Sequence, residues 1–210
     1  MKKSILTLLL YFLTVTSFYS QSTLIKKSKM SHKLETTTLA NGCFWCTEAI
    51  FQRLKGVESV ASGYSGGTIK NPTYKEITTG TTGHAEVIQI TFNPTIITFQ
   101  EILDVFFSTH DPTTLNRQGY DKGTQYRSAV FYHSEEQRII SDTFITNLNE
   151  AKVFENYIVT EVTKFDVFYI AEEYHQNYYN NNKTQGYCTA VINPKLDKFI
   201  KKYKSKLKKQ

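Results

Sequence analysis

Short segments in which apolar and polar residues alternate predict the strands of this chain. Residues 84–92 (HAEVIQITF) show the alternation most clearly, because every second side chain of a strand points to the same face. Residues 36–40 end at Asn41-Gly42, a pair typical of turns, and residues 57–61 run into a long loop rich in Gly, Ser and Asn. The other expected strands cover residues 126–132, 158–163 and 166–170.

Apolar residues spaced three to four positions apart predict the helices. One helix is expected from Cys43 to about residue 54, so that Cys43 lies where a strand passes into a helix. Thr98 and Glu101 form a capping box at the start of a second helix, over 98–109. The remaining expected helices cover residues 134–152, where Ser134 is the cap, and 171–180.

The order of these elements predicts the fold class. Strands and helices mix without a strict strand–helix–strand rhythm, which favours an α+β domain whose mixed or antiparallel sheet packs against helices. Apolar residues make up 40% of the 210 residues, which is enough for a packed core and argues against wholesale disorder.

The first twenty residues have the three-part layout of a secretory signal peptide. Lys2 and Lys3 precede an uncharged apolar run over 5–18, and small residues follow up to Ser20. The run is shorter than the roughly 20 residues that span a membrane, so cleavage is favoured over an uncleaved membrane anchor. We expect a signal peptide over 1–20, a polar linker over 21–34 and an exported mature protein without a membrane span.

The net charge of +6 is concentrated at the C-terminus, where residues 195–210 hold eight Lys and one Asp. Apolar residues from Leu196 to Leu207 have helical spacing. A basic amphipathic helix can bind an anionic membrane or nucleic acid, but a solvated helix that packs by one face is the preferred interpretation. We therefore expect a basic C-terminal helix over 196–210 and no nucleic-acid partner.

The three cysteines, Cys43, Cys46 and Cys188, are an odd number, which fits redox chemistry better than a scaffold of disulfides. A helix N-terminus favours the thiolate form of Cys43, because unpaired backbone N–H groups and the positive end of the helix dipole face it. Cys43 and Cys46 also form a C-x-x-C pair, close enough on one helical turn for a disulfide. The alternative for Cys43 is a buried, inert thiol.

Glu86 is a candidate proton donor. It lies on the more apolar face of its strand, and burial raises the pKa of a carboxyl group towards neutrality. The alternative is a carboxylate at the strand end that reaches solvent. Two long loops contribute further polar candidates, Tyr74, Asp121 and Tyr126, each unremarkable by itself.

Five segments, in order along the chain, resemble the peptide methionine sulfoxide reductases of the A type. They are GCFW (42–45), GYSGG with NPTY (63–67 and 71–74), TGHAE (82–86), HDP with RQGYDKGTQYRS (110–112 and 117–128), and GYC (186–188). They define a catalytic domain over 35–195, and five ordered matches are far more specific than one. The resemblance implies a ferredoxin-like core and the reduction of methionine S-sulfoxide, free or in proteins, as repair of oxidative damage.

The resemblance also implies a role for each matching residue. Cys43 matches the nucleophile, which attacks the sulfoxide sulfur and becomes a sulfenic acid. Glu86 matches the acid that protonates the sulfoxide oxygen. Tyr74 and Tyr126 match hydroxyls that bond this oxygen, and Asp121 matches a polar residue that helps to order the site.

The methyl pocket and the resolving thiol complete the implied site. Phe44 and Trp45 match the pocket for the substrate methyl group, and Cys188 matches the cysteine that resolves the sulfenic acid as a disulfide. Cys46 stands where the family commonly has Gly, so it is an alternative resolving thiol or a relay. Cys188 is favoured as first resolver, because a bridge from Cys43 to Cys46 strains the helical turn. A thioredoxin-like dithiol is implied as the reductant, with no metal or organic cofactor.

The residues alone leave three other interpretations open. A thiol–disulfide oxidoreductase would use Cys43 and Cys46 and would need no buried acid. A metal-binding protein would combine the cysteines with His84 or His175, although one C-x-x-C pair without a second is weak for structural zinc. A non-catalytic binding module would use the basic C-terminal helix.

Overall fold

The computed structural model describes residues 33–209, so the expected signal peptide and most of the expected linker lie outside the described residues. Within this range, six strands form one sheet in the order β7-β6-β1-β3-β2-β8. They are β1 (Glu35–Asn41), β2 (Val57–Ser65), β3 (Ala85–Phe92), β6 (Ser128–Tyr132), β7 (Glu161–Lys164) and β8 (Phe168–Ile170). A separate two-stranded ribbon pairs β4 (Arg117–Gln118) with β5 (Asp121–Lys122).

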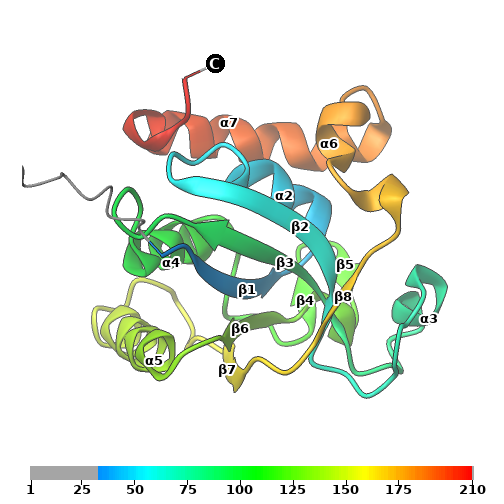
Figure 1. Ribbon diagram of the computed structural model, residues 1–210, viewed down its shortest axis with the longest axis horizontal. Coiled ribbons are helices and arrows are strands. Elements are labelled where there is room, and N and C mark those ends of the chain that lie inside the picture. Colours follow the sequence, from blue (N-terminus) through cyan, green and yellow to red (C-terminus); the bar gives the residue numbers. More distant parts are fainter. Residues whose placement is uncertain (1–32, 210) are drawn as a thin grey trace, which may run out of the picture. The chain divides into compact units, whose positions relative to one another are not determined.

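Six α-helices accompany the sheet in the described part of the chain (Figure 1). They are α2 (Phe44–Phe51), α3 (Tyr74–Thr78), α4 (Phe99–Ser108), α5 (Glu135–Glu150), α6 (Tyr178–Asn181) and α7 (Asn193–Lys202). The predicted capping box of Thr98 and Glu101 begins α4, and the Ser134 side chain caps α5, so both predicted starts are confirmed. No helix among residues 33–209 is both long and apolar enough to cross a membrane.

The central strands form a ferredoxin-like core. Along the chain β1, α2, β2, β3, α4 and β6 follow one another, and in the sheet these strands lie in the order β6-β1-β3-β2 with antiparallel pairing. This is the split βαβ arrangement. β8 extends one edge antiparallel to β2, and β7 extends the other edge parallel to β6. The predicted α+β class, mixed sheet and ferredoxin-like core are confirmed.

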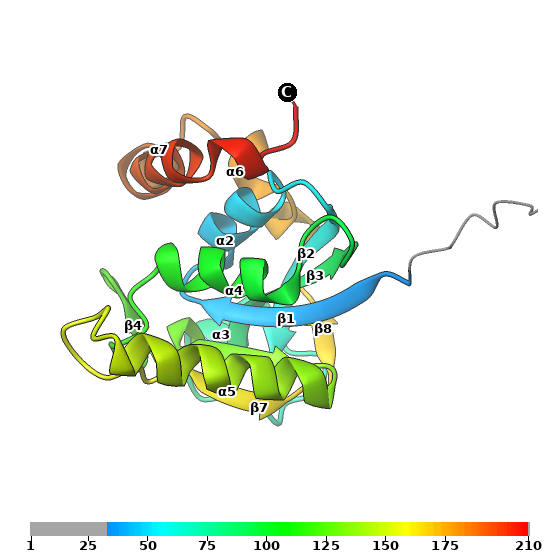
Figure 2. The same cartoon turned by 90° about the vertical axis from the view of Figure 1, so that its left-hand side faces the viewer.

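The helix α2 lies between the sheet and α7, and this layering sets the position of the site (Figure 2). Ile50 and Phe51 of α2 pack into the same buried cluster as Ile88 of β3 and Phe106 of α4. Burial of these apolar side chains is the main force that holds α2, and with it the residues at its N-terminus, against the sheet.

The strand β2 is longer than predicted. Pairing with β3 continues through Ser65, so the segment expected to begin the long loop at residue 62 is instead the interior of the sheet. The small residues of this segment let β8 approach: a Cβ on Gly63 would lie 2.4 Å from the ring of Phe168. This close neighbour comes from more than 100 residues away in the chain, and local sequence does not reveal it.

The helix predicted over 171–180 is wrong, because the segment breaks at Asn177. This residue lies in the left-handed region at φ +52° and separates a single turn, Glu173–His175, from α6. The side chain of Gln176 explains the break, because it bonds the backbone of Ser62 in both directions at 3.0 Å, as a neighbouring strand would.

The basic C-terminal segment is part of the same core. The expected boundary between residues 195 and 196 falls inside α7, and Leu196, Phe199 and Tyr203 are at most 4% exposed. The backbone N–H of Lys208 donates to the carbonyl of Arg53 at 2.8 Å, which ties the end of the chain to the end of α2. The preferred interpretation, a helix that packs by its apolar face, is confirmed, but the expected extent to residue 210 is wrong, because α7 ends at Lys202 and only a short turn, Lys204–Lys206, follows.

Candidate active site

Cys43 is the residue at which β1 passes into α2, as predicted. Its backbone is not yet helical, with φ −57° and ψ 120°, and no side chain caps the helix there. Gly42 lies in the left-handed region at φ +93°, where a Cβ would approach the side chain of Gln118 to 2.7 Å. The predicted Asn41-Gly42 turn is therefore present, and its glycine is required by both the backbone angle and the lack of space.

The Cys43 side chain lines a cavity of about 200 Å³. The cavity gathers all the residues that the sequence predicted for substrate handling, from segments far apart in the chain. The other lining residues are Phe44, Trp45, Tyr74, Glu86, Asp121, Tyr126 and Tyr187. Only Tyr187 has no predicted role.

Glu86 is buried, with 2% of its surface exposed, and its Oε2 accepts a hydrogen bond from the backbone N–H of Phe44 at 3.1 Å. Burial raises the pKa of the Glu86 carboxyl to about 8; the Phe44 bond opposes this rise, and the charges of Asp121 and Cys46 add to it. The carboxyl group is therefore mostly protonated at neutral pH. A buried proton donor, and not a carboxylate that reaches solvent, occupies this position.

The Tyr74 and Tyr126 hydroxyls are protonated donors at the same cavity. Burial, and then the charge of Glu86, raises the pKa of both tyrosines far from the neutral range. The backbone N–H of Tyr74 donates to Glu172 Oε1 at 2.8 Å, and Glu172 Oε2 accepts the Tyr64 hydroxyl at 2.9 Å. Glu172 thereby fixes the start of α3 against β2.

Trp45 forms an aromatic wall of the cavity. Its ring stacks on Tyr178, with 3.7 Å between centroids and 8° between planes, and its Nε1–H donates to His175 Nδ1 at 3.0 Å. Because His175 accepts at Nδ1, its neutral ring carries the hydrogen on Nε2. Burial lowers the pKa of His175, which keeps this ring neutral and able to accept.

Sequence reasoning missed this supporting layer. Its members come from the segment EEYHQNYY (172–179), whose only signal was a high density of aromatic and charged residues in a predicted helix. His175 was considered there only as a metal ligand. His84, the other such candidate, is engaged through both ring nitrogens, with the N–H of Gly67 at 3.0 Å and the carbonyl of Ile69 at 2.7 Å. Within residues 33–209, no three potential ligand side chains converge on a metal site.

A second cavity, of about 260 Å³, shares the lining residues Cys43, Asp121 and Tyr187 with the first. The Tyr187 hydroxyl donates to Asp121 Oδ2 at 2.9 Å and lies 4.0 Å from Cys46 Sγ. Cys43 and Cys46 both line this second cavity, and Lys195 of α7 lines it as well.

Cys43 and Cys46 act on each other's pKa in opposite directions. Burial raises the pKa of Cys43 well above its usual value, and Cys46 and Glu86 raise it further. A hydrogen bond from Cys43 lowers the pKa of Cys46 to about 7, against the effect of burial, and Lys195 lowers it too. The predicted thiolate at Cys43 is therefore wrong for the substrate-free protein. One reason is that Glu86 takes the first backbone N–H of α2, so this N–H is not free to stabilise the thiolate.

Cys188 is completely buried at the start of the π-helical turn Cys188–Ile192, directly before α7. Burial raises the pKa of its thiol, and the charge of Cys46 raises it further. The residues that line the two cavities include Cys43 in both and Cys46 in one, but not Cys188. Its predicted role as the first resolving thiol stays a prediction.

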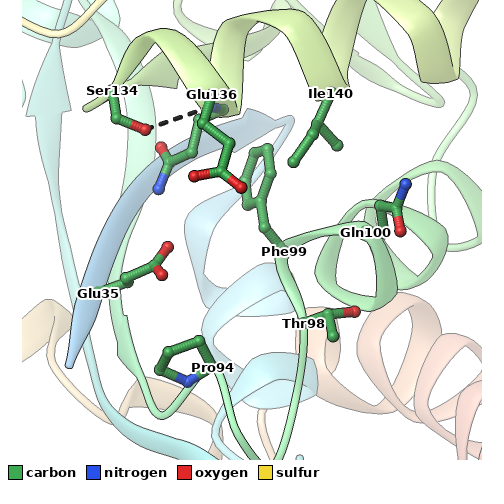
Figure 3. Close-up of a pocket in the computed structure, with 9 residues that line it drawn as sticks. Glu35, Pro94, Thr98, Phe99, Gln100, Ser134, Glu136 and Ile140 are labelled. Atoms are coloured by element: carbon green, nitrogen blue, oxygen red, sulfur yellow. Dashed lines mark hydrogen bonds between the residues drawn. The ribbon is translucent and has the colours of Figure 1, made fainter. Parts of the chain in front are cut away.

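Another depression, of about 250 Å³, lies between the N-terminal ends of α4 and α5 (Figure 3). Its lining combines apolar side chains, such as Phe99 and Ile140, with the carboxylates of Glu35 and Glu136. None of the predicted site residues is among the residues described around it, so it shares nothing with the chemistry at Cys43.

Comparisons with known proteins show which family the chain resembles. The sequence model of the family described as peptide methionine sulfoxide reductase matches residues 35–208. The peptide methionine sulfoxide reductase MsrA of Saccharolobus solfataricus is 54% identical over 175 residues, which cover 83% of this chain and 98% of that protein. The MsrA of Deinococcus radiodurans is 52% identical over 174 residues, 83% of this chain and 84% of that protein.

Solved structures are similar as well. The reduced form of Mxr1 from Saccharomyces cerevisiae matches with a TM-score of 0.68 and 38% identity, over 74% of this chain and 90% of that chain. Methionine sulfoxide reductase A of Corynebacterium diphtheriae matches with a TM-score of 0.65 and 34% identity, over 72% of this chain and 76% of that chain.

Proposed function

The chain belongs to the peptide methionine sulfoxide reductase family, and we propose that Cys43 is the nucleophile of its reaction. As a peptide-methionine (S)-S-oxide reductase it returns the S epimer of methionine sulfoxide to methionine. One observation supports this assignment of residues above all: Cys43 and a buried, protonated acid, Glu86, line the same cavity.

Glu86 activates the sulfoxide. A sulfoxide sulfur is a poor electrophile until its oxygen is hydrogen-bonded or protonated. The neutral Glu86 carboxyl donates its proton to this oxygen, and the hydroxyls of Tyr74 and Tyr126 bond it as negative charge develops. Phe44 and Trp45 supply the apolar wall against which the methyl group lies, and Asp121 orders the site through Tyr187.

Cys43 then takes the oxygen. Its sulfur attacks the sulfoxide sulfur, and its proton replaces the one that Glu86 gave to the oxygen, so the step takes up no net proton. The sulfur–oxygen bond of the substrate breaks, methionine leaves, and Cys43 becomes a sulfenic acid. The substrate sulfur is reduced by two electrons, and the Cys43 sulfur is oxidised by two.

A second thiol of the chain converts the sulfenic acid to a disulfide and releases water. An external dithiol of the thioredoxin type then reduces the disulfide by thiol–disulfide exchange. The resemblance assigns the second thiol to Cys188, with Cys46 as the alternative. A pure thiol–disulfide oxidoreductase is the rival function, and it gives no role to Glu86 or to the tyrosines of the cavity.

The test is a steady-state assay with each epimer of methionine sulfoxide and with dithiothreitol as reductant. Wild type reduces the S epimer and leaves the R epimer untouched. The Cys43→Ser variant, shown to be folded by its thermal unfolding transition, has no activity above background. Unchanged activity in Cys43→Ser would rule out this nucleophile.

We also propose that residues 1–20 direct export of the protein and are cleaved after Ser20. The support is the charge and hydropathy pattern alone. N-terminal sequencing of the protein recovered from the producing cells tests it: cleavage gives a chain that begins at Gln21, whereas a chain that retains residues 1–20 indicates an anchor.

A further inference from the structure

Glu48 of α2 is a second buried acid, and the mechanism at Cys43 does not use it. We propose that Glu48 is a positioning residue, whose carboxyl group holds Tyr178 against Trp45 and so sets the wall that receives the methyl group of the substrate. The role rests on the proposed function, because this wall affects catalysis only if a sulfoxide binds in the cavity at Cys43.

The burial of Glu48 is unfavourable by itself. The residue is 1% exposed, and burial raises the pKa of its carboxyl group to about 7. Within residues 33–209, no lysine, arginine or histidine forms a salt bridge with it. A buried carboxyl group without a cationic partner destabilises a core unless hydrogen bonds satisfy its oxygens. The partners of these oxygens therefore indicate what the residue does.

The carboxyl group of Glu48 binds the backbone at the break before α6. Its Oε1 accepts the N–H of Asn177 at 2.8 Å, and the N–H of Tyr178 bonds the same carboxyl group. N–H groups at the start of a helix find no acceptor within the helix itself. Asn177 also lies in the left-handed region, at φ +52°, which is unfavourable for a residue other than glycine. The two hydrogen bonds thus stabilise a strained turn and fix the place at which α6 begins.

The segment that Glu48 holds is the one that contacts Trp45. Tyr178 stacks on the Trp45 ring, with 3.7 Å between centroids. His175, two residues before Asn177, accepts the Trp45 Nε1–H at 3.0 Å. Glu48 and Trp45 are themselves neighbours on α2, because residues three positions apart lie on the same side of a helix. A closed set of contacts therefore runs from the Glu48 carboxyl through the backbone of 177–178 and the Tyr178 ring back to α2.

These contacts separate substrate binding from the chemical step. Loss of the Glu48 carboxyl group frees the backbone at Tyr178, and with it one of the two partners of Trp45. The acid Glu86 is held by a different contact, its hydrogen bond with the N–H of Phe44. The methyl wall is therefore expected to loosen while the proton donor and the nucleophile stay in place, so that KM changes more than kcat.

Steady-state reduction of methionine S-sulfoxide tests this separation in Glu48→Leu, Tyr178→Leu and the variant that combines them. Each single substitution is expected to raise KM about 5–30-fold and to lower kcat by less. The combined variant should have no higher KM than the worse single variant, because both substitutions remove the same contact. If the two increases in KM multiply in the combined variant, Glu48 does not act through Tyr178 and the proposal is overturned.

Two conservative substitutions guard against a variant that merely fails to fold. Glu48→Gln keeps an acceptor oxygen at the same reach and should restore the KM of wild type. Glu48→Asp keeps the carboxyl group but withdraws it from the backbone of 177–178, so its KM should rise as in Glu48→Leu. A KM equal to that of wild type in a folded Glu48→Asp would overturn the proposal.

Trp45 fluorescence tests the contact without substrate, because this tryptophan is the only one in the chain. Its emission should shift to the red in Glu48→Leu, Glu48→Asp and Tyr178→Leu, and it should stay at the wavelength of wild type in Glu48→Gln. An unshifted spectrum in both Glu48→Leu and Glu48→Asp would overturn the positioning role. If wild type does not reduce the sulfoxide at all, the proposed function fails, whereas the fluorescence still decides whether Glu48 holds Tyr178 against Trp45.

Discussion

The Glu86 carboxyl oxygen Oε2 accepts a hydrogen bond from the backbone N–H of Phe44 at 3.1 Å, so the proton donor on β3 is joined to the first turn of the nucleophile's helix. This contact fixes the acid beside Cys43. It also removes from Cys43 the backbone donor that a helix N-terminus would otherwise offer to a thiolate. The site therefore combines a protonated acid with a nucleophile whose pKa is raised, next to Cys46, whose pKa is lowered to about 7.

Replacing Glu86 by Gln should remove the proton donor and keep the contact, because the Gln side-chain oxygen can still accept the Phe44 N–H. We expect the rate of S-sulfoxide reduction to fall by about 10²–10⁴-fold, the usual contribution of general acid catalysis. The rate of methionine formation at saturating substrate measures this. Glu136→Gln, an exposed carboxylate on α5, is the control and should match wild type; a Glu86→Gln enzyme with full activity would favour the thiol–disulfide rival.

The same substitution should change how stability depends on pH. The pKa of Glu86 is raised to about 8 in the folded chain, above that of an unfolded glutamate, so between these values the folded state binds more protons. Glu86 therefore lowers the free energy of unfolding progressively as the pH rises from about 5 to about 8. Urea unfolding at both ends of this range should show that Glu86→Gln gains stability relative to wild type at the higher pH. An equal difference at both pH values would contradict a raised pKa.

Trp45 should depend on His175 for its position. His175→Phe keeps the aromatic shape but leaves the Trp45 N–H without its acceptor, which costs about 1–3 kcal/mol for a buried donor. We expect KM to rise more than kcat falls, because the methyl wall moves while the acid and the nucleophile stay in place.

Fluorescence provides an independent measure of this change, because Trp45 is the only tryptophan of the chain. Its emission should shift to the red in His175→Phe and should recover in His175→Gln, which restores an acceptor oxygen. Identical spectra in all three proteins would mean that the hydrogen bond does not hold the ring.

The C-terminal helix should be required for stability. Phe199→Ala in α7 removes a side chain that is 2% exposed, and such substitutions cost about 3–5 kcal/mol. The neighbouring exposed residue supplies the control, Lys198→Ala, which should change the free energy of unfolding little. Chemical denaturation of both variants measures this. Equal stabilities would mean that α7 is peripheral.

Local sequence was sufficient where a short-range interaction decides the structure. The capping box at Thr98 and the turn at Asn41-Gly42 depend on residues within four positions, and both were predicted. The break at Asn177 was not predicted, because it depends on the hydrogen bond between Gln176 and Ser62, which are 114 residues apart.

The same distinction separates the features of the candidate site that the sequence predicted from those that it did not. Family motifs identified the residues of the cavity, including Cys43 and Glu86, because each lies in a matching segment. The ionisation of Cys43 was predicted wrongly, because burial, Cys46 and the distant Glu86 act together on its pKa. The position of Lys195 beside Cys46 depends on how α7 packs over α2, which spacing along the chain does not reveal.

The most direct test of the account is a single turnover of the Cys46→Ser/Cys188→Ser double variant, in which only Cys43 can react. With one equivalent of methionine S-sulfoxide and with dimedone present, we predict one methionine released per chain and one dimedone adduct, located at Cys43 in the tryptic peptide that covers residues 34–53. Two results would contradict the assignment of Cys43 as the nucleophile that takes the sulfoxide oxygen. One is methionine formed while Cys43 remains unmodified, and the other is no methionine from a correctly folded double variant.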